Sequence, residues 1–304
     1  MHWVSKEGYI EIYPPMDFNF KECLLFLNRS SQEVLHRIKE GHLYKLLKFD
    51  ESLILCKISW LDPIIRVEFP LHIVSKTEQE WVVTYIWEWF DLDYELDSFY
   101  RGASEEKLLK ELIIKYRGLR IIGIPDLFEA ICWAILGQQI TLSFAYRLKK
   151  SFVEHYGECI SFEEEDYWTF PSAHVIAELN VEELKKLQFS TRKAEYIIDI
   201  AKVISNGQLS KEDLLALNDY HLVKKRLVSQ RGVGPWTADY VMMKCLHFSN
   251  AFPIGDVGLH NAIKVQARMN RKPTLEELTS ISKKWKGFEA YAIFYLWRSL
   301  YETS

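Results

Sequence analysis

Hydrophobic positions in the first hundred residues follow a short period that is typical of strands. Runs rich in β-branched and aromatic residues span Ser52 to Trp60, Ile64 to Phe69 and Trp81 to Trp87, with turn residues between them. Residues 30–41, from Ser30 to Gly41, have a pattern that predicts a helix. The pattern therefore predicts a small α+β domain with an antiparallel sheet over residues 1–100.

From about Ser104 onward the hydrophobic period becomes helical. Asp126 is placed to cap a helix that runs to Gly137, and a second helix should begin near Thr141 and end at Gly157. Further helices should begin at Asn180, Ser210 and Thr274. Another helix should end at Gly207. We expect residues 101–304 to be all-helical, so the chain is mainly α with an N-terminal α+β domain.

A tight turn between two amphipathic segments is the most informative local pattern. In LVSQRGVGPWTADYVMMKC, Gly232, Val233 and Gly234 form the turn, and Pro235 opens the next helix, where its missing N–H costs nothing. Two glycines let the backbone approach a ligand closely, and free amides at a helix start suit a phosphate. The structural alternative is an ordinary helix-helix turn with Val233 packed in the core.

Charge and cysteine content narrow the class of protein. The formal net charge is −4, but residues 1–100 carry 10 Lys and Arg against 17 Asp and Glu, so the helical region is comparatively basic. That asymmetry permits a polyanionic partner. The 5 cysteines are widely scattered and never closely paired, which argues against a structural zinc site and against a four-cysteine iron-sulfur cluster. No signal peptide or membrane-spanning run is evident, so we expect a cytoplasmic protein.

The hairpin and the segment after it resemble the helix-hairpin-helix (HhH-GPD) superfamily of DNA glycosylases. The turn is followed by Thr237 and Ala238, and FPIGDVGLHNAI then places Asp256 at the position of the catalytic aspartate of that superfamily. FDLDYELDSFY, PDLFEAICWAILGQQIT and YAIFYLW resemble segments of the AlkA type of DNA-3-methyladenine glycosylase II. The resemblance implies a bilobal helical core with an active-site cleft between two helical lobes, and a TATA-binding-protein-like sheet domain at the N-terminus.

The resemblance also implies site residues and a reaction. Asp256 would be the catalytic carboxylate that stabilises positive charge on the sugar or orients water. Trp236 stands where superfamily members that also cut the DNA backbone carry a lysine, which implies simple hydrolysis by a monofunctional enzyme. Trp236, Tyr240 and Trp297 would line a pocket for an extruded, cationic alkylated purine. The implied chemistry needs no metal and no cofactor.

DNA contacts would come from the hairpin and from a helix break. Gly232, Val233 and Gly234 would hold a phosphate, and the GQQIT break would place Gln138 and Gln139 at the duplex, with Gln139 filling the space left by the extruded base. Relatives usually carry an arginine where this chain has Glu289, which puts one contact and the substrate range in doubt. The expected partner is double-stranded DNA containing alkylated bases, bound by a monomer.

Two other functions stay open at this point. The hairpin could belong to a non-catalytic module that binds DNA without sequence preference, in which case Asp256 and the aromatic residues would be idle. The chain could also be an oxidised-base glycosylase with lyase activity, which Trp236 disfavours. Asp256 has a purely structural alternative too, as the N-cap of the helix LHNAIKVQARM.

Overall fold

A six-stranded antiparallel sheet forms the N-terminal part of the computed structural model, which describes residues 1–301. The spatial order of the strands is β1-β2-β6-β5-β4-β3, and every neighbouring pair is antiparallel. The predicted antiparallel sheet is confirmed. The strands are β1 (Trp3–Lys6), β2 (Tyr9–Ile12), β3 (Arg37–Lys39), β4 (His42–Phe49), β5 (Ser52–Leu61) and β6 (Ile64–Glu68).

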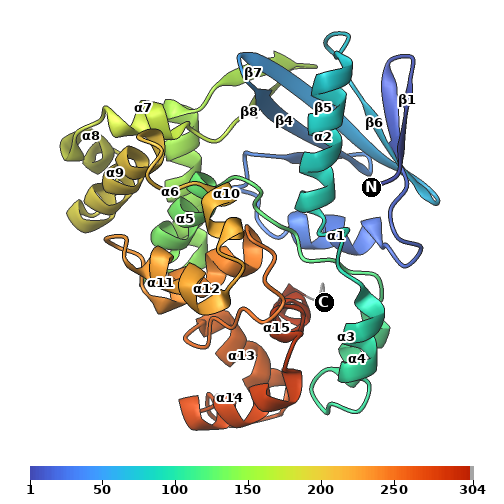
Figure 1. Ribbon diagram of the computed structural model, residues 1–304, viewed down its shortest axis with the longest axis vertical. Helices are drawn as coiled ribbons and strands as arrows, with labels where there is room; N and C mark the ends of the chain where they lie inside the picture. The colour runs from blue at the N-terminus through green and yellow to red at the C-terminus, as the bar shows by residue number, and fades with distance from the viewer. Residues whose placement is uncertain (302–304) are drawn as a thin grey trace.

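Two local predictions in this region are wrong. Residues 30–41 form turns and β3 instead of a helix, because the Glu33 carboxylate accepts hydrogen bonds from the amides of Val34 and Leu35, both at 2.9 Å. The helix lies earlier, in α1 (Phe20–Leu27). The run from Trp81 to Trp87 is part of α2 (Lys76–Trp89), whose start is fixed by a capping box of Ser75 and Glu78. Helix α2 crosses one face of the sheet (Figure 1).

Short helices with short connections make up most of the rest of the chain. The predicted caps at Asp126 and Thr141 are confirmed, since each side chain accepts a hydrogen bond from a first-turn amide. The helices of this region are α3 (Leu96–Ala103), α4 (Lys110–Lys115), α5 (Leu127–Gly137), α6 (Leu142–Tyr156), α7 (Ala173–Ala177), α8 (Val181–Lys186), α9 (Thr191–Ser205), α10 (Lys211–Ala216), α11 (Tyr220–Val228), α12 (Pro235–Lys244), α13 (Val257–Gln266), α14 (Leu275–Ser282) and α15 (Glu289–Arg298), with 3₁₀ turns at η1 (Lys283–Trp285) and η2 (Ser299–Tyr301).

A two-stranded hairpin interrupts the helices, which corrects the all-helical prediction. It consists of β7 (Cys159–Phe162) and β8 (Glu165–Trp168) and lies beside the N-terminal sheet (Figure 1). Its turn residues Glu163 and Glu164 have φ values of 50° and 64°, a conformation for which the usual sequence signal is glycine or asparagine. Two glutamates give no such signal. Across the contact, Lys48 Nζ lies 2.6 Å from Glu158 Oε1.

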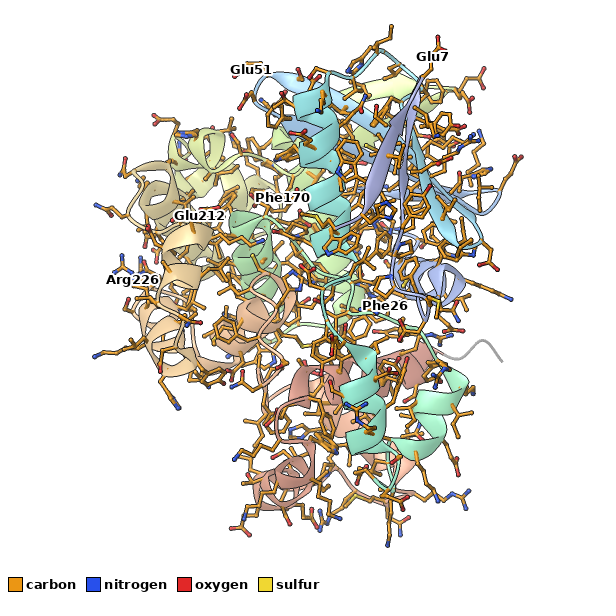
Figure 2. The ribbon with its side chains drawn as sticks, turned by 45° about the vertical axis from the view of Figure 1, so that its right-hand side comes forward. Glu7, Phe26, Glu51, Phe170, Glu212 and Arg226 are labelled. Carbon is orange, nitrogen blue, oxygen red and sulfur yellow. The ribbon has the colours of Figure 1, made fainter. Side chains whose placement is uncertain are left out.

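One continuous core joins the sheet region to the helices. Helix α15 is central to it: Phe294 packs on Phe26 of α1 with ring centroids 4.5 Å apart, and the Tyr291 hydroxyl donates to Asp91 at 2.6 Å. Figure 2 shows Phe26 in the interior near this junction. The predicted domain boundary at residue 100 falls within α3 and stays a prediction. None of the helices in residues 1–301 combines the length and apolar character needed to cross a bilayer.

Candidate active site

Asp256 stands at the first turn of α13, where the chain enters the helix. Its backbone is extended, with φ −70° and ψ 123°, and its Oδ1 accepts the amide of Leu259 at 2.7 Å. An aspartate is favoured here because it satisfies an amide that has no partner within the helix. The structural interpretation of Asp256 as an N-cap is therefore confirmed, and it fixes the orientation of the carboxyl group.

Trp297 of α15 holds the same oxygen from the opposite side. Its indole N–H donates to Asp256 Oδ1 at 2.8 Å. Both hydrogen bonds fall on Oδ1, so Oδ2 receives none from the residues that the structure describes. The two donors thus hold the carboxyl group in one orientation, and Oδ2 is left without a hydrogen bond from residues 1–301.

The electrostatics of Asp256 follow from burial and from these donors. Burial raises the pKa of the Asp256 carboxyl above its ordinary value, and the N–H groups of Leu259, Trp297 and Trp236 partly offset that rise. The indole N–H of Trp236 makes no hydrogen bond with any part of residues 1–301, although it lies close enough to act on this pKa. Asp256 is a half-buried carboxylate surrounded by donors.

Aromatic side chains gather beside Asp256. Trp236 and Tyr240 of α12 have ring centroids 5.6 Å apart, and Tyr240 and Trp297 have centroids 6.2 Å apart. The three rings are mutually tilted by 31° and 37°. In Figure 1, α12 belongs to the group of helices from α5 to α12, and α15 to the group formed with α13 and α14. The four side chains predicted for catalysis and for the base pocket therefore come from α12, from the start of α13 and from α15, and lie together.

Two further aromatic residues of the pocket were not predicted. Trp133 of α5 and Tyr146 of α6 form one buried cluster with Tyr240, and their ring centroids are 4.8 Å apart. Their sequence signal is weak, because an aromatic residue in an amphipathic helix usually belongs to the core. Only their position on either side of the GQQIT break hints at a role.

Gly258 is a third residue that the sequence analysis missed. A Cβ placed there would lie 2.9 Å from Asp256 Oδ1 and 3.2 Å from Trp297 Nε1. Glycine in the first turn of a helix is unfavourable in itself, which is the signal that could have found it. The absence of a side chain at this position lets the carboxylate and the indole meet.

The hairpin turn has the backbone geometry that its glycines predict. Gly232 has φ 87°, and a Cβ there would lie 2.3 Å from the Tyr196 ring, so no other residue fits. Val233 is buried, as the structural alternative expects, and can offer a ligand only its backbone. Gly234 caps α12, and apart from its chain neighbours no atom of residues 1–301 would lie within 4 Å of a Cβ there. The surface next to Gly234 is open for the close approach of a ligand.

Gln138 and Gln139 differ sharply in their surroundings. The Gln138 amide donates to the Gly232 carbonyl and to the Thr237 hydroxyl, both at 3.0 Å, so this residue ties the break after α5 to the hairpin. Gln139 is exposed and has φ 58°, and its side chain makes no hydrogen bond within residues 1–301. A left-handed glutamine is strained by about 1 to 2 kcal/mol, and such strain is concentrated at functional sites.

Glu289 takes no part in the cluster around Asp256. Glu289 accepts the amide of Gly287 at 2.7 Å at the start of α15. Its carboxylate thus serves the helix terminus. Within residues 1–301, no three His, Cys, Asp or Glu side chains are grouped as a metal site requires.

Comparisons with known protein families divide the chain into two parts. Residues 132–287 match the family described as HhH-GPD superfamily base excision DNA repair protein. Residues 14–131 match the family described as 8-oxoguanine DNA glycosylase, N-terminal domain. The two matches meet within α5.

Individual relatives and solved structures agree with these matches. The chain is 43% identical over 304 residues to the DNA-3-methyladenine glycosylase of Bacillus subtilis, covering 99% of this chain and 100% of that protein. It is 27% identical over 180 residues to DNA-3-methyladenine glycosylase 2 of Escherichia coli, covering 59% and 60% of the two chains. The 3-methyladenine DNA-glycosylase structure from Archaeoglobus fulgidus has the same fold, with a TM-score of 0.80 at 22% identity and coverage of 96% and 99%.

Proposed function

The chain belongs to the HhH-GPD superfamily of base excision DNA repair proteins, and on this premise we propose that it is a DNA glycosylase of the 3-methyladenine type. It hydrolyses the N-glycosidic bond of alkylated purines in DNA. The observation that carries the proposal is the Asp256 carboxylate, held by Trp297 at 2.8 Å beside an aromatic pocket.

The roles of the pocket residues follow from the charge of the reacting nucleotide. Breaking the glycosidic bond builds positive charge on the sugar, and Asp256 Oδ2 is the oxygen free to stabilise it or to orient water. An alkylated purine is cationic before the bond breaks and leaves readily. Trp236, Tyr240 and Trp297 provide ring faces that attract such a base by stacking and by cation–π interaction.

Trp236 makes the proposed enzyme monofunctional. An indole nitrogen cannot form a Schiff base with the sugar, so water is the nucleophile and the DNA backbone stays intact. Borohydride added during turnover should trap no enzyme-DNA adduct above background. A trapped adduct that disappears when one lysine is replaced would show a lyase step instead.

Duplex DNA would be held by the hairpin and opened at the break after α5. The amides around Gly232 and Gly234 sit at the start of α12, where backbone donors and the helix dipole favour a phosphate. Gln139, exposed and without a protein partner among residues 1–301, would occupy the space that the extruded base leaves.

Base release from methylated DNA tests the proposal directly. The parent should release free methylated bases, and Asp256→Asn should bind the same DNA yet release bases at least about a hundredfold more slowly. A parent protein that retains DNA in a gel without releasing base would instead be a non-catalytic binding module.

A second candidate is favoured by the match of residues 14–131 to the N-terminal domain of 8-oxoguanine glycosylases. In that case the preferred lesion would be an oxidised purine. Duplexes that contain a single 8-oxoguanine, assayed beside methylated duplexes, separate the two candidates by the ratio of single-turnover rates.

A further inference from the structure

Arg29 brings a cation from the N-terminal region to the aromatic pocket. It follows the C-cap of α1, and its guanidinium lies over the Phe26 ring at 4.2 Å and 5.7 Å from the centroid of Tyr146. Phe26 itself packs on α15, the helix that carries Trp297 (Figure 2). The contacts with Phe26 and Tyr146 hold the guanidinium beside these two rings.

Most of the N–H groups of Arg29 have no acceptor among residues 1–301. Within residues 1–301 its single hydrogen bond runs from Nη1 to the Phe26 carbonyl at 2.9 Å, and it forms no ion pair there. The nearby carboxylate of Glu33 is committed elsewhere: it accepts Lys149 Nζ at 2.5 Å and two loop amides. Although burial alone would raise the pKa of Glu33, Lys149 holds it well below its usual range.

The guanidinium lies beside the aromatic cluster of Trp133, Tyr146 and Tyr240. Arg29, Trp133 and Tyr240 line one cavity of about 50 Å³. Burial raises the pKa of the Tyr240 and Tyr146 hydroxyls, and in both cases the charge of Arg29 partly offsets the rise. The charge of Asp256 also acts on Tyr240. Tyr240 is therefore under the influence of both Arg29 and the candidate catalytic carboxylate.

The chemistry of a guanidinium sets which bases it can hold. It has five N–H donors and no acceptor, so it pairs with a carbonyl oxygen and opposes an amino group. We propose that Arg29 is a specificity residue that donates to O6 of an extruded 6-oxopurine, such as 7-methylguanine or hypoxanthine. The inference rests on the proposed function and extends it: adenine-type lesions, whose N6 amino group is a donor, lose this contact.

Methylated DNA supplies a matched pair of substrates. Dimethyl sulfate produces both 7-methylguanine and 3-methyladenine, and both lesions are cationic in the nucleotide. Repulsion by Arg29 therefore affects the two alike, and the ratio of their release rates isolates the contact at position 6.

The expected change is a shift in that ratio. Arg29→Met keeps the apolar stem on Phe26 and removes the donors, so the ratio of 7-methylguanine to 3-methyladenine release should fall about tenfold, the usual worth of a good contact to a base edge. Hypoxanthine release from a defined duplex should fall by the same factor. Arg29→Lys keeps one ammonium donor, so its ratio of 7-methylguanine to 3-methyladenine release should lie between the ratios of the parent and of Arg29→Met. The matched control is Arg101→Met, at an exposed position of α3.

Equal losses for all three bases, or no change in the ratio, would overturn the proposal. A melting temperature for each variant separates loss of folding from loss of selectivity. If the parent releases no base, the proposed function fails, and equilibrium dialysis with free hypoxanthine and free adenine still tests Arg29. The parent should then bind hypoxanthine about tenfold more tightly than adenine, and Arg29→Met should remove that preference; equal affinities in the parent would contradict it.

Discussion

Replacing Gly258 with alanine should slow base release without weakening the fold. The new Cβ would lie 2.9 Å from Asp256 Oδ1, whereas ordinary contacts of this kind begin at 3.4 Å. The oxygen cannot swing aside cheaply, because it accepts hydrogen bonds from Leu259 and Trp297. The carboxylate must therefore move by roughly half an ångström, close to the tolerance of a productive site.

The size of the effect follows from that displacement. A misplacement of 1 Å can cost about a hundredfold in rate, so half that distance corresponds to about tenfold, or about 1.4 kcal/mol of barrier. Alanine also favours a helix over glycine by up to about 1 kcal/mol. The melting temperature should thus hold or rise while the single-turnover rate falls.

Gly255 offers a matched control one residue before Asp256. Apart from its chain neighbours Ile254 and Asp256, no atom of residues 1–301 would lie within 4 Å of a Cβ at that position, so Gly255→Ala adds the same methyl group at an exposed backbone position beside Asp256. Single-turnover release from methylated duplex is measured for both variants at saturating enzyme. Equal rates for the two variants, or a further loss when Gly258→Ala is added to Asp256→Asn, would refute the argument that the methyl group acts through Asp256.

Three more predictions concern charge, backbone and the helix break. Because burial raises the pKa of Asp256, activity should fall on the acid side at a higher pH than for an ordinary aspartate. At neutral pH the ionised carboxylate lowers the stability of the fold, so Asp256→Asn should melt at a higher temperature than the parent. This difference in melting temperature should vanish as the pH falls below the unfolded-state pKa of about 3.9. Gly234→Asp should weaken binding to damaged and undamaged duplexes alike in gel titrations, because it places a carboxylate where a phosphate approaches, and unchanged affinity would reduce the turn to a structural role. Gln139→Ala should slow excision from paired lesions more than from mispaired ones without lowering the melting temperature, and equal losses would exclude a wedge.

The sequence predicted best those features that depend on local chemistry. Asp126, Thr141 and Thr274 cap helices where their side chains can reach a first-turn amide, which is a short-range effect. Residues 30–41 and the β7-β8 hairpin were mispredicted for the complementary reason. A glutamate that binds loop amides and two left-handed glutamates leave no compositional signal.

The candidate site was predictable only in part. The family resemblance, carried by the hairpin and the segment around Asp256, pointed to one carboxylate and three aromatic residues, which the structure brings together. Trp133 and Tyr146 became visible only from tertiary contacts, since each has an ordinary local pattern, and the unfavourable helical glycine at Gly258 does not by itself say what it contacts. The role proposed for Arg29 depends on its position beside Tyr146 and Tyr240, which are far away in the sequence. The hydrophobic pattern around Arg29 gives no sign of this position.

The position of α15 has a consequence for the order in which the protein assembles. The pocket needs Trp297 from this helix, yet α15 is itself anchored by Phe26 and Asp91 from the other end of the sequence. Contacts between such distant segments form late in folding, because closing long loops is entropically costly. The hairpin, built from neighbouring helices, needs no such closure. A nascent or partly folded chain would thus form the turn at Gly232 and Gly234 before it brings Asp256 and Trp297 together.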